Sequence, residues 1–249
     1  MKTNIEYISQ SFVAAGIIAK NIQKLIPPDS YFSEQSSLVK RYIYFQENIK
    51  EYNWIIPPST KVGVLKEMIK EFENKNLTQK KVDSILIKSF KKKKFQTIDV
   101  ILNNIKNNKI YSKRKKQLQN CLVAIKKFDK LEKTSVTILI PTLLVLIDAL
   151  IFDFIKNKKI PFNGNYKSKS DKKNGRIDKF IEAITIPNDD MQNLLSEILD
   201  SLIFERTENL ETNNTINRHT VIHGENFIFG NEADLFKLVA IIDAFKGLE

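Results

Sequence analysis

Apolar residues recur at intervals of three and four along most of the chain, which is the spacing of one face of an α-helix. In chain order, the predicted helices cover 5–26, 38–49, 64–72, 78–90, 95–107, 111–132, 136–155, 189–203 and 231–245. Seven glycines in 249 residues are too few for the special turns of a β-sandwich or barrel, and no glycine-rich nucleotide-binding motif occurs. The sequence therefore predicts an all-α fold.

Two proline pairs mark helix boundaries. Pro27-Pro28 and Pro57-Pro58 remove backbone donors and push the preceding residue away from helical geometry. After the second pair, Ser59 or Thr60 is the expected N-cap of the next helix.

The apolar helix at 136–155 is long enough to raise the question of a membrane span. It contains two aspartates, Asp148 and Asp153, and a carboxylate near the centre of a bilayer costs about 2.5–3.5 kcal/mol. Because no second apolar span accompanies it, we expect the central helix of a soluble bundle and no membrane contact. A buried Asp148 would then need a partner.

The polar stretch from Lys156 to Gly175 predicts an exposed loop. The last helix is expected to begin after Asn231, whose side chain can act as its N-cap. Cys121 is the only cysteine and cannot form an intramolecular disulfide, and the N-terminal residues lack the pattern of a signal peptide. We therefore expect a cytoplasmic protein, with Cys121 and Trp54 in its core.

Positive charge is concentrated in the middle of the chain. Residues 61–135 hold 21 lysines and arginines against seven acidic residues, in a chain of net charge +11. The densest runs are Lys91, Lys92, Lys93 and Lys94, next to Phe95, and Lys113, Arg114, Lys115 and Lys116, close to Tyr111. Cations beside aromatic rings are typical of surfaces that bind phosphates and stack bases, so these runs are candidate RNA-binding residues. A solvated surface without a binding role is the alternative.

Both histidines of the chain, His219 and His223, lie four residues apart beside Arg218. On a helix these two positions share a face. An imidazole moves protons near neutral pH, and a guanidinium holds a phosphate with two hydrogen bonds. Such groups cleave RNA without a metal when a base removes the 2′-hydroxyl proton and cations stabilise the charged phosphorane.

The string Arg218-His219-Thr-Val-Ile-His223 resembles the signature of HEPN-domain ribonucleases, which has an arginine, a polar residue, a spacer and a histidine. The resemblance covers residues 126–249 and implies a HEPN-like helical bundle there. Residues 1–125 form an N-terminal helical region in this interpretation, basic from 61, which is either a separate domain or a set of additional helices on the same bundle. The family also implies a homodimer whose two motifs converge on one composite site, without a metal or cofactor.

The resemblance assigns roles to four residues. Arg218 would bind and stabilise the scissile phosphate, His223 would act as general acid or base, and His219 would help to position the substrate. Asp148 would orient the motif, at a place where the family more often carries Glu. The implied activity is endoribonuclease cleavage of RNA by an antiphage (abortive infection) or toxin-like effector, with a cognate antitoxin or defence-system protein as a further partner.

Each of these residues also has a structural explanation. His223 could end a helix next to Gly224, and Asp148 could form a salt bridge within the bundle. A zinc site at the two histidines lacks the usual accompanying ligands, so no metal is expected. The alternative function is a noncatalytic HEPN-fold module that binds nucleic acid or forms a complex.

Overall fold

The computed structural model describes residues 45, 48–128, 133–162, 175–185, 190–204, 216–223 and 230–248. Its elements in chain order are η1 (Lys50–Tyr52), α4 (Val62–Glu73), α5 (Gln79–Asn107), η2 (Lys109–Tyr111), α6 (Lys115–Lys127), α7 (Lys133–Asn157), α8 (Arg176–Ile184), α9 (Asp190–Ile198), η3 (Leu199–Ile203), α10 (Arg218–Ile222), α11 (Glu232–Ala244) and η5 (Phe245–Leu248). Every element in this part of the chain is helical, which confirms the all-α expectation. The predicted helix at 5–26 and most of the one at 38–49 lie outside the described residues.

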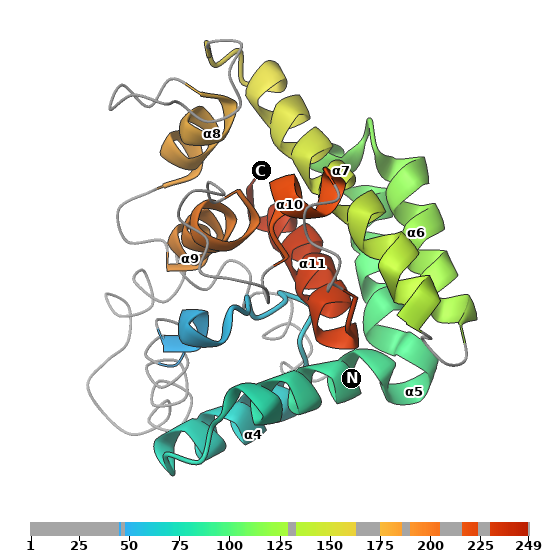
Figure 1. Cartoon of the computed structure of the whole chain (residues 1–249), viewed down its shortest axis with the longest axis vertical. Coiled ribbons are helices and arrows are strands. Elements are labelled where there is room, and N and C mark those ends of the chain that lie inside the picture. The colour runs from blue at the N-terminus through green and yellow to red at the C-terminus, as the bar shows by residue number, and fades with distance from the viewer. Residues whose placement is uncertain are drawn as a thin grey trace, which may run out of the picture.

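Helix α11 runs through the middle of the bundle, with α5 and α7 on one side and α9 on the other (Figure 1). Its N-cap is Asn231, as predicted, because Asn231 Oδ1 accepts a hydrogen bond from the backbone N–H of Asp234 at 2.8 Å. All residues from Ala233 to Ala244 are buried. The expectation that 136–155 would be the central helix was therefore wrong, since α11 is buried on every side and α7 is not.

The polar side chains of α11 are buried with partners. Asp243 is fully buried and accepts hydrogen bonds from the Ser59 backbone N–H at 2.8 Å and the Ser59 hydroxyl at 3.0 Å. The amide of Asn104 donates to the same carboxylate at 3.3 Å. Burial raises the pKa of Asp243 above its usual range. These partners allow a helix with three charged residues in its buried stretch to occupy the core.

The prediction that Ser59 or Thr60 caps the next helix was wrong. Helix α4 begins one residue later, with Lys61 at the N-cap and no side-chain capping bond. The physical reason is that the Ser59 hydroxyl donates to Asp243, and Thr60 is buried. Tertiary contact with α11 thus replaces the local cap.

Helix α5 consists of two helical segments joined at a tight turn. The backbone leaves helical geometry at Lys92, and Lys93, Lys94 and Phe95 follow with φ of 51°, 54° and 63°. The predicted break between 78–90 and 95–107 is therefore confirmed. Phe95 packs near Phe236 of α11, with ring centroids 6.5 Å apart, which fixes the turn against the central helix.

The predicted helix at 111–132 is shorter in the structure. Asn108 Oδ1 accepts from the Ile110 backbone N–H at 2.9 Å and starts a 3₁₀ turn, η2, so that α6 begins only at Lys115. Tyr111, at the end of η2, is buried, and its hydroxyl donates to the Ile242 carbonyl at 2.7 Å. This bond to α11 holds the turn in place of a longer helix.

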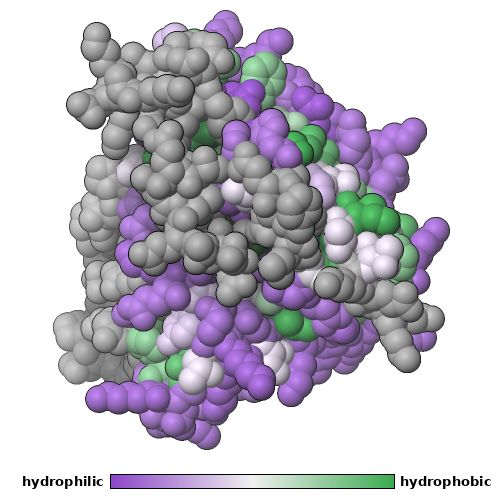
Figure 2. All heavy atoms as spheres, in the orientation of Figure 1, coloured by the Kyte–Doolittle hydropathy of each residue, from purple (hydrophilic) through white to green (hydrophobic). Residues whose placement is uncertain are grey.

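Helix α7 is buried on one side and open on the other. Ile138 and Val145 are 65% and 50% exposed, and Pro141, Ala149 and Phe152 on the same side are partly exposed. In Figure 2 the surface over α7 shows apolar and near-neutral spheres among polar ones. Among the described residues, α7 is the helix that is long and apolar enough to cross a membrane. The core helix of a soluble protein meets the same criteria of length and composition.

A helix that the sequence did not predict follows. Helix α8 begins at Arg176, and Ile177, Phe180 and Ile184 form its buried side. Phe180 packs edge-on against Phe154 of α7 with ring centroids 5.2 Å apart. Much of the expected loop, 163–174, lies outside the described residues.

One contiguous cluster of buried apolar side chains extends from Phe45 to Leu248. Trp54 and Cys121 both belong to it, as expected. Because α11 packs on both α5 and α7, helices from either side of residue 125 share this core. The division into regions 1–125 and 126–249 stays a prediction.

Candidate active site

Helix α10 is a short element whose start is fixed by a buried cap. Asn217 is fully buried, and its Oδ1 accepts from the backbone N–H groups of His219 at 2.9 Å and Thr220 at 3.2 Å. Val221 is also buried and anchors the turn to the core. This arrangement satisfies the first free donors of the helix and turns the motif residues outward.

The two histidines lie together on the exposed side of α10. Their ring centroids are 4.4 Å apart, so the predicted shared face is present. Both residues are exposed, and His223 forms the C-cap of the helix. Gly224, the residue of the alternative helix-end explanation, lies outside the described residues.

Asp148 of α7 connects the motif to the rest of the bundle. Its Oδ2 lies 3.4 Å from Nη2 of Arg218, and its Oδ1 lies 2.6 Å from Nη2 of Arg176, the first residue of α8. The side chains of Arg176, Asp148 and Arg218 are 19%, 15% and 23% exposed. One carboxylate therefore holds two guanidinium groups at the surface of the bundle, beside α10.

Sequence reasoning missed Arg176. It follows directly after the expected loop, which ends at Gly175, and no helix was predicted there although Ile177, Phe180 and Ile184 have helical spacing. That spacing was the available signal for the helix. The approach of Arg176 to Asp148 depends on how α8 packs against α7, which the sequence pattern does not show.

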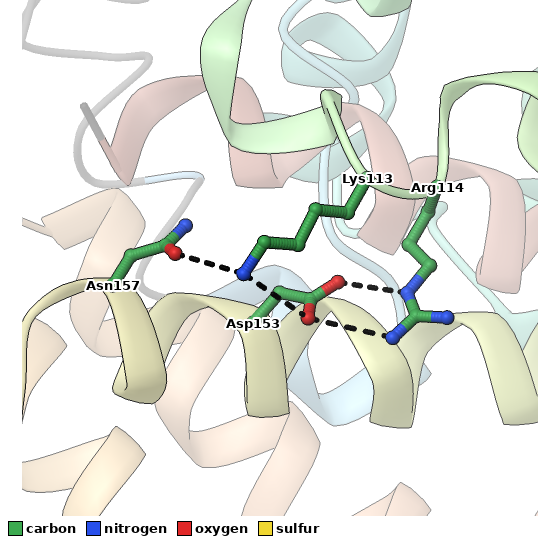
Figure 3. A network of polar contacts seen from close by, with 4 residues as sticks. All are labelled: Lys113, Arg114, Asp153 and Asn157. Atoms are coloured by element: carbon green, nitrogen blue, oxygen red, sulfur yellow. Dashed lines mark hydrogen bonds and ion pairs between the residues drawn. The ribbon is translucent and has the colours of Figure 1, made fainter.

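The candidate RNA-binding cations have different environments. Lys113 and Arg114 face Asp153, which is 4% exposed: Arg114 Nε donates to Oδ2 at 2.7 Å, and Lys113 Nζ lies 3.8 Å from Oδ1 and also contacts Asn157 (Figure 3). This contact gives Arg114 a structural role between η2 and α7.

The remaining candidate lysines belong to α5 and α6. Lys91 forms an ion pair with Glu232 of α11 at 2.7 Å, and Lys115 donates to the Lys106 carbonyl at 3.0 Å. The exposed lysines among the candidates are Lys91, Lys92, Lys93, Lys94, Lys113 and Lys116, and Lys115 is partly exposed. The middle of α5 thus presents four consecutive lysines to solvent, more than 120 residues before α10 in the chain.

No group of three or more metal-ligating side chains occurs among the residues that the structure describes. His219 and His223 therefore make a pair without a third ligand in this part of the chain. Comparisons of the chain with known protein families, with curated proteins and with solved structures find no match. The function is accordingly argued from the geometry of α10 and α7.

Proposed function

We propose that this chain is a metal-independent endoribonuclease of the HEPN type, acting in the cytoplasm as an antiphage or toxin-like effector. The observation that carries the proposal is the short helix α10, which bears two imidazoles with ring centroids 4.4 Å apart and Arg218, whose guanidinium lies 3.4 Å from Asp148. A phosphate-binding cation and proton-transferring groups at one open position are what cleavage by a 2′-hydroxyl requires.

Each residue has a role in this proposal. Arg218 binds the scissile phosphate and stabilises the negative charge that grows on the phosphorane. His223 removes the 2′-hydroxyl proton or protonates the departing 5′ oxygen, and His219 helps to position the strand. Asp148 orients the Arg218 guanidinium. The products carry a 2′,3′-cyclic phosphate because the attacking oxygen belongs to the substrate.

The distance between the two imidazoles favours a homodimer. In-line displacement puts the attacking and leaving oxygens on opposite sides of phosphorus. Two hydrogen bonds of about 2.8 Å with a phosphate between them span more than the 4.4 Å that separates the rings of His219 and His223. An imidazole of one copy therefore acts on the attacking or the leaving oxygen, and an imidazole from a second copy acts on the other of these two oxygens.

The open side of α7 is the surface proposed for that second copy. Ile138 and Val145 lie at its centre, and Asp148, three residues after Val145, lies at its edge. Two copies packed through this side in a symmetric dimer bury the apolar stripe and bring the two α10 turns close to one another.

The test is cleavage of a single-stranded RNA by the full chain in EDTA. We expect the products to carry 2′,3′-cyclic phosphate ends. An RNA with 2′-O-methyl groups should not be cut. His223→Ala should lower the cleavage rate at least 100-fold. His219→Ala is the matched control on the same turn and should reduce the rate less. Equal cutting by His223→Ala would contradict the assignment.

The rival function is a noncatalytic nucleic-acid-binding or complex-forming module. The exposed Lys92, Lys93 and Lys94 favour it, because they present charge far along the chain from α10. In that case binding falls steeply with salt, survives Arg218→Ala and His223→Ala, and no cleavage occurs. If expression of the protein arrests growth and His223→Ala relieves the arrest, the nuclease function is favoured over the noncatalytic one. Relief by a co-expressed neighbouring protein would identify a cognate antitoxin.

A further inference from the structure

Arg176 and Arg218 come from different helices and meet the same carboxylate. Asp148 Oδ1 pairs with Arg176 at 2.6 Å and Oδ2 with Arg218 at 3.4 Å, so one carboxylate contacts guanidinium groups from α8 and α10. The cluster is partly open, and the exposed His219 follows Arg218 directly. The guanidinium groups of two helices therefore converge at one partly open place beside α10.

We propose that Arg176 is a second phosphate-binding residue of this site, and that Arg176 and Arg218 together bind the sugar–phosphate backbone of RNA. This inference rests on the proposed function, since it takes RNA as the ligand. A guanidinium matches a phosphate in shape and holds it with paired hydrogen bonds. Asp148 then acts as a positioning residue that holds two guanidinium groups at one place.

The local structure supports a ligand-binding role for Arg176. Position 176 is the first of α8, where the helix dipole disfavours a cation. Asp178 in the same turn completes the local cap by accepting from the Gly175 N–H at 2.9 Å. The guanidinium also lies over the Phe152 ring, 5.5 Å from its centroid, which fixes its direction toward α7.

The neighbouring pair on α7 gives a contrast. Arg114 contacts both oxygens of Asp153, at 2.7 and 3.4 Å, and Asp153 is 4% exposed. One arginine there takes both oxygens of one carboxylate, with Lys113 farther away at 3.8 Å. At Asp148 the two oxygens are shared between two arginines, and all three side chains reach solvent.

The experiment measures binding of a 2′-O-methyl RNA oligonucleotide, which cannot be cut, to the full chain by fluorescence anisotropy over a series of salt concentrations. For Arg176→Ala we expect affinity to fall about tenfold. The slope of log K against log salt should become shallower by about 0.7, the value for one phosphate contact on a single strand. Arg176→Lys keeps the charge and should keep the slope.

Lys179→Ala is the matched control. It removes the same charge from the same helix, where Lys179 pairs with Glu182 at 2.7 Å, and should change neither affinity nor slope. Circular dichroism and thermal unfolding establish that each variant is folded. A folded Arg176→Ala protein with the affinity and slope of the wild type would overturn the inference.

Cleavage in EDTA by the wild type separates this inference from the proposed function. If the wild type cuts RNA and Arg176→Ala binds unchanged, the inference fails and the nuclease assignment stands. If Arg176→Ala weakens binding and the wild type cuts nothing, the phosphate site stands and the nuclease assignment fails. Absence of binding by the wild type overturns the inference.

Discussion

The side chain of Asn217 is fully buried, and its Oδ1 accepts a hydrogen bond from the backbone N–H of His219 at 2.9 Å, although the His219 ring is exposed. A buried amide therefore sets the direction of an exposed motif. Because α10 has only five residues, this cap supplies much of what keeps it helical.

Replacement of Asn217 by alanine should reduce cleavage more than it reduces stability. We expect a loss of about 1–2 kcal/mol in the free energy of unfolding, measured with urea, and a rate at least tenfold lower for the folded protein. Asn231→Ala removes the equivalent cap of α11 and is the matched control. It should cost similar stability and leave the rate of the folded protein unchanged.

Replacement of Asp148 by asparagine should lower the cleavage rate about tenfold, because a neutral amide no longer orients two guanidinium groups. Asp153→Asn, five residues along α7, should instead lower the free energy of unfolding by about 2 kcal/mol and leave the rate near that of the wild type. Kinetics and urea unfolding of both variants check this. Wild-type activity in Asp148→Asn would remove Asp148 from the site.

The buried carboxylate of Asp243 predicts a pH dependence of stability. Burial is the main cause of its raised pKa, which hydrogen bonds from Ser59 and Asn104 and the charge of Lys246 only partly oppose. A raised pKa means that the folded state binds the proton more tightly than the unfolded state does. The stabilisation is thus complete below the unfolded pKa and is lost as pH rises through the folded pKa.

The measurement compares urea unfolding of the wild type and Asp243→Asn at several pH values from the unfolded pKa of aspartate upward. The wild type should gain stability relative to Asp243→Asn as the pH falls through the raised pKa of Asp243. A difference between the two proteins that stays constant with pH would contradict this prediction.

The exposed apolar side of α7, with Ile138 and Val145, predicts a dimer that a single charged substitution on this side disrupts. Val145→Glu should shift the protein from dimer to monomer in analytical ultracentrifugation and lower cleavage with it. Val100→Glu, on α5, is the control, since Val100 is 43% exposed outside this stripe. A wild-type monomer, or a dimer unaffected by Val145→Glu, would argue against α7 as the interface.

Local signals in the sequence predicted much of the fold. They failed where contacts between residues far apart in the sequence determine the structure. The Asn231 cap and the break near Lys92 depend on neighbouring residues, and both were predicted. The hydroxyl of Ser59 was expected to act locally, but it bonds to Asp243, 184 residues away. A capping preference of about 1 kcal/mol is readily outweighed by satisfaction of a buried carboxylate.

The candidate site shows the same division. The motif on α10 is contiguous, so its residues were found in the sequence. Asp148 was found because a carboxylate in an apolar helix is conspicuous, and the structure places it 3.4 Å from Arg218. No feature of the sequence distinguished Arg176, because its ion pair with Asp148 forms only when α8 packs against α7.

The central position of α11 has a consequence for synthesis of the protein. Among the described α-helices, α11 leaves the ribosome after all the others, yet Ser59, Asn104 and Tyr111 all bond to it. Until it emerges, the earlier helices surround an unfilled centre and expose apolar surface. The bundle therefore completes its folding only after translation has passed residue 244, and the nascent chain before that point is the form most exposed to chaperones and proteases.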